Sequence, residues 1–483
     1  MDHETPLGYL IAAACVVVST IAAVLMFGSW RMSPAAVAAT AVTEERARAL
    51  SDLLLEAAGR GTFMGLDIGG SLSKLVIVDP GSGSAKSALM AKILAFVTGR
   101  AEFGQTGRRD EHLELRLDEG VVVHLVRFQT RRMAGALALA KEQLRAAVHA
   151  APAASGIGAG ELGELNCTGG GARKFEASFA ERAGLRLRAH DELTCLVRGL
   201  TSLLRHGGGT SEAFTVDPDD GSRAPLAMAG PGVDVYPLVL VNVGSGVSIV
   251  LVEGPGTWRR VSGTPIGGGT FFGLTNMLTG LTSFDTMLEL AARGDHTRVN
   301  LTVGDIYGEG ESVYGLRPDH IAANFGKPLA ETRHPTDAVA GARDGRDDVA
   351  ASGGAAAGDA AAAAGVGEQD GSEAADDGGA AGFLPDGRFR ASQEDVCAAT
   401  LVLVTDQVAQ AAVLTARQHG VRRVLFAGSF LRHGGGSDAP HRRLSWAVSA
   451  WSGGRSQAAF LRREGYYGAL GALLVGGEAA GRE

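Results

Sequence analysis

The sequence predicts an α/β protein made of two similar halves that face a shared cleft. Segments with strand and helix character alternate along the chain up to about Lys327. An internal repeat is the second observation, because LDIGGSLSKLVIV (66–78) superimposes without a gap on VNVGSGVSIVLVE (241–253). Each copy reads as a strand, a Gly/Ser turn and a returning strand, so we expect each half to open with a β-hairpin.

The N-terminal residues differ in character from these halves. The run from Leu7 to Gly28 contains no charge and is long enough to cross a bilayer of about 30 Å as one helix. Arginines follow it at Arg31, Arg46 and Arg48, and the positive-inside rule then places the rest of the chain in the cytosol. The alternative is a cleaved or organellar targeting segment, which would leave a cytosolic or mitochondrial protein.

Composition divides the chain into four parts. Residues 1–60 form the transmembrane segment and a linker that ends in a helix, and residues 61–235 form the first half. The second half comprises residues 236–332 and 386–483, interrupted by an Ala/Gly/Asp tract at 333–385. Such a tract buries too little apolar surface to offset its ordering entropy, so we expect a disordered insertion.

One long helix is expected after the tract. The segment QEDVCAATLVLVTDQVAQAAVLTARQHG follows Ser392 as N-cap, has acidic residues in its first turn and ends at Gly420. A strand with a glycine near its end, VRRVLFAGSF (421–430), comes after the helix. The second half therefore continues the alternation of strands and helices.

The composition also excludes some classes of function. A formal net charge of -8 leaves no broadly basic face, which argues against binding nucleic acid. The four cysteines are far apart and form no CxxC pair, so neither a disulfide framework nor a zinc site is indicated. Glycine is abundant, with 70 of 483 residues, and part of this excess lies in specific turns.

Glycine-rich turns point to an anion site. Besides the two hairpin turns, NCTGGGARKF (166–175) and GTPIGGGTFFGL (263–274) each place three glycines before a helical segment. Successive glycines let backbone N–H groups converge on an anion, and a helix N-terminus adds a favourable dipole. One such turn alone is often only a tight hairpin or a flexible loop, but four together favour a nucleotide phosphate site. Neither a Walker A loop nor a Rossmann fingerprint is present, so those folds are disfavoured.

Three side chains near these turns have the chemistry of a transfer reaction. DELTCLVRGL (191–200) reads as an amphipathic helix with Asp191 as N-cap, which leaves Glu192 in the first turn. There the helix dipole keeps a carboxylate ionised, as a general base requires, although acidic residues are common at helix starts for stability alone. Arg260 could clamp a carboxylate or a phosphoryl group, and Lys74 could reach phosphates. An exposed strand arginine and a solvated strand lysine are the plain alternatives.

Several motifs in one order indicate a resemblance to a known family. They are FMGLDIGGSLSKLV, TGGGARKFE, DELTCLVRGL, VNVGSGVSI, RRVSGTPIGGGTFFGL, ARGDHTRV, GDIYG, VLFAGSFLR and REGYYGALGALL. Over most of 63–330 and 390–475 the chain resembles the eukaryotic-type (type II) pantothenate kinases of the acetate and sugar kinase/Hsc70/actin superfamily. The resemblance implies two duplicated actin-like (ribonuclease H-like) lobes with an interdomain cleft, here preceded by one N-terminal transmembrane helix.

The resemblance also implies an activity. Members of this family use ATP and Mg²⁺ to phosphorylate the primary hydroxyl of pantothenate to 4'-phosphopantothenate, the first step of coenzyme A biosynthesis. They are homodimers inhibited by acyl-CoA, which occupies the ATP and pantothenate sites. We therefore expect a homodimer with ATP, Mg²⁺, pantothenate and an acyl-CoA inhibitor as ligands. The alternatives are another small-molecule (amino-sugar type) kinase of the superfamily and a non-catalytic acyl-CoA-sensing pseudokinase.

The family motifs imply roles for residues of this chain. By resemblance Glu192 is the catalytic base, and Arg260 is catalytic and also holds substrate. Pantothenate would further contact Ser245 and Ser248, and Asp67 would bind the metal. The side chains and turns that would hold ATP are Gly69, Gly70, Ser71, Lys74, Gly267, Gly268 and Gly269.

The remaining motifs agree with the family in part. The helix that carries Ala447 and Trp451, with REGYYGALGALL, resembles the dimer and acyl-pocket region. Thr194 replaces the family's second Asp after DEL, and Ser71 replaces its usual Thr. The family's GLPG turn appears as GLRP (315–318), a change that concerns substrate affinity and feedback more than the chemistry. Because the base and the arginine are both present, we expect an active enzyme.

Overall fold

The protein folds into two compact units. The computed structural model describes residues 34–60, 63–70, 72–80, 86–99, 114–117, 120–141, 163–206, 212–228, 234–308, 316–331, 381–383, 389–431 and 438–480. Unit 1 consists of Met1–Ala213, Pro225–Val235 and Gly465–Glu483, and unit 2 consists of Phe214–Ala224 and Tyr236–Glu464.

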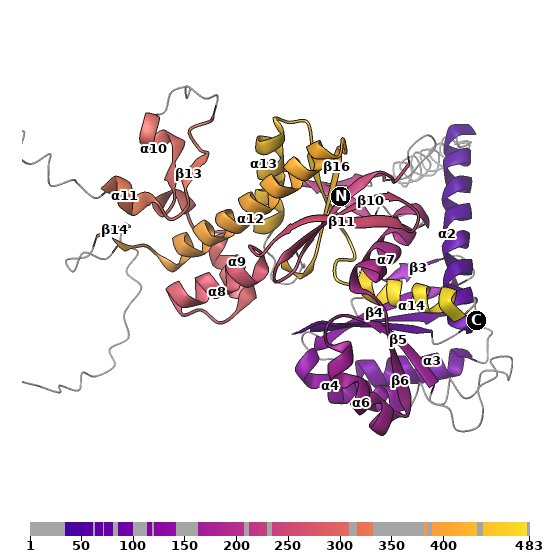
Figure 1. Ribbon diagram of the computed structural model, residues 1–483. Helices are drawn as coiled ribbons and strands as arrows, with labels where there is room; N and C mark the ends of the chain where they lie inside the picture. Colours follow the sequence, from indigo (N-terminus) through magenta and orange to yellow (C-terminus); the bar gives the residue numbers. More distant parts are fainter. Residues whose placement is uncertain are drawn as a thin grey trace, which may run out of the picture. The chain divides into compact units, whose positions relative to one another are not determined.

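Unit 1 contains a mixed six-stranded sheet with the strand order β3-β4-β2-β1-β5-β6 (Figure 1). Its strands are β1 (Met64–Ile68), β2 (Leu72–Asp79), β3 (Leu115–Arg116), β4 (Val122–Gln129), β5 (Gly163–Thr168) and β6 (Leu185–Ala189). The predicted repeat hairpin 66–78 is the antiparallel pair of β1 and β2, and β4 extends it into a meander. On the other side of β1 the sheet continues with β5 and β6, which run parallel to it.

Helices pack on both faces of this sheet. They are α2 (Pro34–Arg60), α3 (Lys86–Thr98), α4 (Met133–Leu139, after the short helix η4, Thr130–Arg132), α6 (Ala172–Ala183), α7 (Glu192–His206) and α14 (Tyr467–Ala480). The face that carries Leu66 and Ile68 forms an apolar core with α3, α4 and α6. The opposite face carries Gly65, against which α14 lies, and α7 packs alongside α14 (Figure 1). This second face is where the candidate site of unit 1 is built.

Unit 2 contains a mixed seven-stranded sheet with the order β11-β10-β9-β16-β17-β7-β8. Its strands are β7 (Ala213–Val216), β8 (Arg223–Leu226), β9 (Leu238–Val243), β10 (Val247–Gly254), β11 (Thr257–Thr264), β16 (Arg423–Ala427) and β17 (Gln457–Leu461). The antiparallel meander β9-β10-β11 is followed across the sheet by β16 and β17, which run parallel to β9. This is the strand pattern of unit 1 again, and it confirms the predicted α/β fold with two similar halves.

The core of unit 2 lies against helices α9 (Phe284–Ala291), α12 (Gln393–Gln418) and α13 (Ala439–Ser452). The turn before α8 (Gly268–Thr279) belongs to the candidate site of this unit. The smaller elements are η7 (His296–Arg298), β12 (Leu301–Thr302), α10 (Val303–Tyr307), β13 (Ile321–Ala323), α11 (Lys327–Glu331), β14 (Gly382–Phe383), β15 (Phe389–Arg390) and η8 (Ser429–Leu431). Within this unit β14 and β15 pair with each other, close to the start of α12 in the chain.

Helix α12 matches its prediction. Ser392 Oγ accepts a hydrogen bond from the Asp395 backbone N–H at 3.1 Å, and Gly420, just beyond the helix, has a φ of 67°. Within the described part of the chain, α12 is the single helix long and apolar enough to cross a membrane. However, 72% of its most apolar window is buried inside the protein, as in the core helix of a globular unit.

Two expected segments fall on residues that the structure does not describe. The uncharged run 7–28 lies outside the described residues, so the membrane helix stays a prediction. The tract 333–385 lies outside them too, except for 381–383.

The unit boundaries differ from the predicted ones at the C-terminus. The sequence predicts that residues 386–483 belong to the second half, but Gly465–Glu483 belongs to unit 1. The reason is packing, because α14 lies against β1, β5 and α7, all of which are elements of unit 1. Helix α2, expected within a linker, also packs against α14 and α7.

Candidate active site

The turn of the first hairpin holds an ion pair. In the antiparallel register of β1 and β2, Asp67 lies directly opposite Lys74. Lys74 Nζ is 3.2 Å from Asp67 Oδ2, and the two side chains are only 13% and 16% exposed. The end of β4 fixes this turn, since the Thr130 hydroxyl donates to the Gly69 carbonyl at 2.8 Å and lies 3.0 Å from Ser73 Oγ. The described residues on both sides of the expected nucleotide turn are therefore held by hydrogen bonds and an ion pair.

Glycines let two other segments approach Asp67. A Cβ atom at Gly169, whose φ is 88°, would lie 2.6 Å from Asp67 Oδ1. A Cβ at Gly468, in the first turn of α14, would lie 3.3 Å from Asp67 Oδ2. In the TGGG motif Gly171 also packs tightly on Ile68, whereas Gly170 has open space around it. Close approach to β1 therefore explains two of these three glycines, which the sequence analysis attributed to anion binding.

Glu192 lies at the start of α7, as predicted. Asp191 Oδ1 accepts hydrogen bonds from the Thr194 backbone N–H and hydroxyl, both at 2.8 Å, which confirms Asp191 as the helix cap. Thr194, a departure from the family pattern, thus takes part in the cap. The Glu192 side chain is exposed, and among the described residues its carboxylate has no hydrogen-bond or ion-pair partner.

The environment of Glu192 changes its acidity. Partial removal from water raises the pKa of the Glu192 carboxyl, the charges of Asp67 and Asp191 raise it further, and Lys74 lowers it. Asp67 and Lys74 form an ion pair, and both of their charges act on the Glu192 carboxyl within the same unit. Unit 1 therefore brings together the expected base, the expected metal-binding carboxylate and the expected phosphate-binding lysine.

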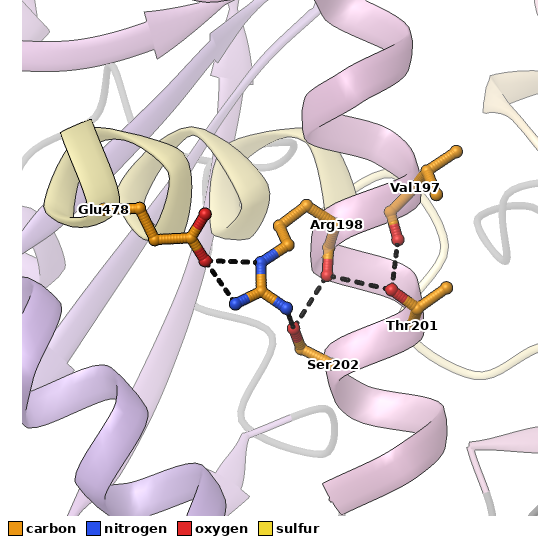
Figure 2. A network of polar contacts seen from close by, with 5 residues as sticks. All are labelled: Val197, Arg198, Thr201, Ser202 and Glu478. Carbon is orange, nitrogen blue, oxygen red and sulfur yellow. Dashed lines mark hydrogen bonds and ion pairs between the residues drawn. The ribbon is translucent and has the colours of Figure 1, made fainter. Parts of the chain in front are cut away.

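Helix α7 is held in place by α14. Figure 2 shows Arg198 of α7 with its guanidinium on Glu478 of α14; Arg198 Nε is 2.8 Å from Glu478 Oε1, and a second guanidinium nitrogen contacts the same oxygen. The Ser202 hydroxyl donates to the Arg198 carbonyl at 2.8 Å, so it supports the same turn (Figure 2). Two glycines bring the helix backbones together, since a Cβ at Gly199 would lie 2.1 Å from the Tyr467 carbonyl oxygen. A Cβ at Gly471 would lie 1.8 Å from the Cys195 carbonyl oxygen.

The segment REGYYGALGALL has a role that the sequence analysis missed. It was expected in the dimer and acyl-pocket region, but within this chain it begins α14 and is buried against β1 and α7. Buried Tyr467 donates a hydrogen bond to buried Glu212, which belongs to the same unit. The small residues at intervals of three to four were the available signal, because they are typical of closely packed helices.

In unit 2 the second repeat turn and the GGG turn form one structure. The Gly268 backbone N–H donates to the Gly244 carbonyl at 2.8 Å, and the Gly269 N–H donates to the Ser245 carbonyl at 2.9 Å. A Cβ at Gly267 or Gly268 would lie 2.8 Å from one of these carbonyl oxygens. The two expected binding turns are thus in contact, and glycine is required there by the closeness of two backbones.

Arg260 and Ser248 are neighbours on the meander of unit 2. Arg260 Nε, on β11, lies 3.3 Å from Ser248 Oγ on β10. The guanidinium is exposed and Ser248 is half-buried. Among the described residues, this hydroxyl is the one hydrogen-bond partner of the Arg260 guanidinium, which is otherwise open to a ligand's anionic group.

The other predicted positions are placed as follows. Ser71 lies outside the described residues. Ala447 is fully buried in the core of unit 2, whereas Trp451, one turn later in α13, is 40% exposed. No group of three or more His, Cys, Asp or Glu side chains in the described ranges is arranged to hold a metal ion, so Asp67 would need ligand oxygens to complete a site.

Comparison with known proteins identifies the family. The family model Fumble matches residues 63–475. The chain belongs to the Fumble family, that of the type II pantothenate kinases. It is 33% identical over 419 residues to "Pantothenate kinase 2" of Oryza sativa subsp. japonica, covering 86% of this chain and 38% of that protein. It is 35% identical over 310 residues to "Pantothenate kinase 1" of Arabidopsis thaliana, covering 64% of this chain and 65% of that protein.

Another protein similar to this chain carries a different name. The "4'-phosphopantetheine phosphatase" of Mus musculus is 29% identical over 413 residues, covering 86% of this chain and 40% of that protein. The chain therefore spans less than two thirds of the length of each of these relatives.

Solved structures with a similar arrangement are distant. A ROK family glucokinase from Streptomyces griseus, in complex with glucose and AMPPNP, is 11% identical with a TM-score of 0.35, covering 85% of this chain and 98% of that one. An activator of the 2-hydroxyisocaproyl-CoA dehydratase from Clostridium difficile is 11% identical with a TM-score of 0.33, covering 87% of this chain and 95% of that one. These scores are too low to carry an argument, so the fold rests on the repeated strand pattern of the two sheets.

Proposed function

We propose that this Fumble-family protein is an active pantothenate kinase that transfers the γ-phosphate of ATP to the primary hydroxyl of pantothenate. The observation that carries the proposal is the group of Asp67, Lys74 and Glu192 in unit 1. Phosphoryl transfer mainly requires positioning, charge neutralisation and one group that accepts the hydroxyl proton. These three side chains offer a cation, a carboxylate for a metal and a second carboxylate for the proton.

The hairpin turn is assigned to the ATP phosphates and Mg²⁺. Mg²⁺ usually binds one or two carboxylates together with phosphate oxygens and waters, and Asp67 fits this pattern as a single oxygen ligand. Lys74 would neutralise phosphate charge from the same turn. When bound, the metal would supply positive charge that offsets the charge developing on the phosphate oxygens.

Glu192 is assigned the proton from the pantothenate hydroxyl. A raised pKa makes a carboxylate a better proton acceptor, because the proton it takes up is held more firmly. The carboxylate is also exposed and has no partner among the described side chains, so it can contact a substrate without breaking an existing interaction. Asp191 fixes the first turn of α7 and thereby the position from which Glu192 projects.

Unit 2 carries groups whose chemistry fits pantothenate. The Arg260 guanidinium can form a bidentate contact with a carboxylate or a phosphoryl group, and Ser245 and Ser248 can bond to the hydroxyl and amide groups of pantothenate. The glycine turn at 267–269, which is hydrogen-bonded to the turn that carries Ser245, suits the nucleotide side, as the family resemblance implies. Homodimer formation, inhibition by acyl-CoA and attachment to a membrane stay predictions.

A coupled ADP-release assay tests the proposal. The purified chain is given ATP and Mg²⁺ with pantothenate, with a panel of amino sugars, and without acceptor. We expect ADP release that depends on pantothenate, and a loss of about 10²–10⁴-fold in Glu192→Gln because the proton acceptor is removed. Glu181→Gln, an exposed carboxylate on α6, is the matched control and should turn over as the parent does.

Three results would contradict the proposal in different ways. Turnover of an amino sugar but not of pantothenate would assign the other kinase class. Folded protein without turnover of any acceptor would indicate a non-catalytic protein. Full activity of Glu192→Gln would remove the base assignment while leaving the kinase assignment intact.

A further inference from the structure

Two adjacent arginines on β11 raise the question of which one can serve the site. Side chains of successive strand residues point to opposite faces of a sheet. Arg260 Nε lies 3.3 Å from Ser248 Oγ, whereas Arg259 Nε lies 3.6 Å from Glu253 Oε2. Some feature of the strand must therefore decide that Arg260, and not its neighbour, shares a face with Ser248.

The pairing of β10 with β11 contains that feature. Gly263 lies opposite Ser248, and Ser262 lies opposite Ile249. A regular ladder would continue with Arg260 opposite Leu251, but the structure places Arg260 opposite Val250. One residue of β11, Val261, is thus extra, which is the definition of a β-bulge.

The bulge changes the face on which Arg260 lies. Ile249 and Leu251 point into the core of unit 2, and Val261 packs against that same core. Ser248 and Val250 lie on the opposite face, because residues two apart in a strand share a face. Without the extra residue Arg260 would pair with a core-facing position, so the bulge brings it to the face of Ser248.

A missing side chain makes room for the guanidinium. A Cβ atom at Gly263 would lie 2.2 Å from Arg260 Nη2 and 2.5 Å from the Val247 carbonyl oxygen. Gly263 does not have a positive φ, so its backbone conformation alone does not require glycine. The space occupied by the Arg260 side chain explains the glycine at this position.

We propose that the bulge at Val261 and the missing side chain at Gly263 act together to aim Arg260 at the anionic group of the substrate. This inference rests on the proposed function, since it assigns Arg260 a ligand. Val261 and Gly263 are positioning residues, because they act through Arg260 and not on the substrate. The ligand chemistry is a carboxylate or a phosphoryl oxygen, to which a planar guanidinium can donate two hydrogen bonds.

Gly263→Ala is the direct test in the ADP-release assay. Displacement of a binding group by about 1 Å can cost about 100-fold in rate, so we expect a fall in kcat of that order. Gly254→Ala is the control from the same hairpin, since its Cβ would meet Thr257 at an ordinary 3.9 Å. Arg260→Gln removes the guanidinium itself, and Arg259→Gln, which removes the neighbouring guanidinium, is its control. Both controls should stay within about twofold of the parent, a difference that corresponds to about 0.4 kcal/mol.

A double variant separates positioning from a general loss of structure. The Gly263→Ala change also crowds the Val247 carbonyl, so it can weaken the hairpin whatever Arg260 does. If Gly263 acts through the guanidinium, adding Gly263→Ala to Arg260→Lys should cost little further kcat. If the fold-losses in kcat of the two single variants multiply in the double variant, the substitutions act independently and the positioning inference is overturned.

A crystal structure of Gly263→Ala gives a readout that does not depend on activity. We expect the contact between Arg260 Nε and Ser248 Oγ to be lost while the β10–β11 register is kept. An unchanged contact would overturn the inference. If the parent protein shows no pantothenate-dependent ADP release, the proposed function fails, and this structure still decides whether Gly263 positions Arg260.

Discussion

The contact between α7 and α14 makes a strong prediction about one glycine. A Cβ at Gly471 would lie 1.8 Å from the Cys195 carbonyl oxygen and 2.5 Å from its carbonyl carbon. Both atoms belong to the backbone of α7, so no side-chain rotation can relieve the overlap. Gly471→Ala therefore forces the two helices apart.

The size of the effect follows from these distances. An ordinary carbon–oxygen contact is about 3.3 Å, so the helices must separate by about 1.5 Å. Overpacking of a core costs about 1–3 kcal/mol, and a backbone clash lies at the upper end of that range or above it. Alanine regains about 1 kcal/mol of helix propensity relative to glycine. We expect a net loss of about 2 kcal/mol or more, or about 4–8 °C in the melting temperature of a unit of this size.

Thermal unfolding followed by circular dichroism measures this change. Gly273→Ala, in α8, is the control, because a Cβ there meets nothing within 4 Å and the residue has no positive φ. That substitution should raise the melting temperature slightly through helix propensity alone. Gly471→Ala should also lower kcat at 20 °C, because Cys195 lies three residues after Glu192 in α7. A melting temperature at or above that of the parent would show that the two backbones are not in contact.

Two further predictions concern the charged groups of unit 1. Partial removal from water and the charges of Asp67 and Asp191 raise the pKa of Glu192. A base must be ionised, so kcat should fall as pH falls through that raised pKa, and this limb of the pH profile should vanish in Glu192→Gln. A raised pKa means that the folded state favours the protonated Glu192 carboxyl, so this stabilisation is lost as pH rises through the raised pKa. Glu192→Gln should therefore have a higher melting temperature than the parent at pH 8. An unchanged melting temperature would contradict the raised pKa. Lys74→Met should raise the KM for ATP by about tenfold or more, since it removes a phosphate-binding cation and leaves Asp67 unpaired. Lys92→Met, an exposed lysine on α3, should leave the KM unchanged, and equal effects of the two would remove the assignment of Lys74.

Local pattern was sufficient for the parts of the fold that short segments determine. The repeat hairpins needed only a strand, a Gly/Ser turn and a strand, and both form where the sequence places them. The cap at Asp191 and the first-turn position of Glu192 depend on neighbours within three residues. The same holds for α12, whose start at Ser392 is a local hydrogen bond.

Contacts between segments that are far apart in the sequence could not be predicted from local pattern. Gly169 and Gly171 of the TGGG motif allow a close approach to Asp67 and Ile68 of β1, and the motif itself does not indicate those partners. The residues 465–483 belong to unit 1 because α14 packs on β1 and α7, which lie hundreds of residues earlier in the chain. The bulge at Val261 exists only as a mismatch between two strands, so neither strand alone reveals it.

The structure also bears on why the two carboxylates of unit 1 would have different roles. Asp67 faces Lys74 across the hairpin at 3.2 Å, so a carboxylate and a cation lie together, as a metal and phosphate oxygens require. Glu192 has no such cation as a direct partner among the described residues, and partial removal from water with the neighbouring negative charges raises its pKa. A carboxylate held in an ion pair and a second carboxylate free to contact the substrate can divide charge stabilisation from proton transfer. The register of β1 with β2 matters to the chemistry because it places Lys74 opposite Asp67.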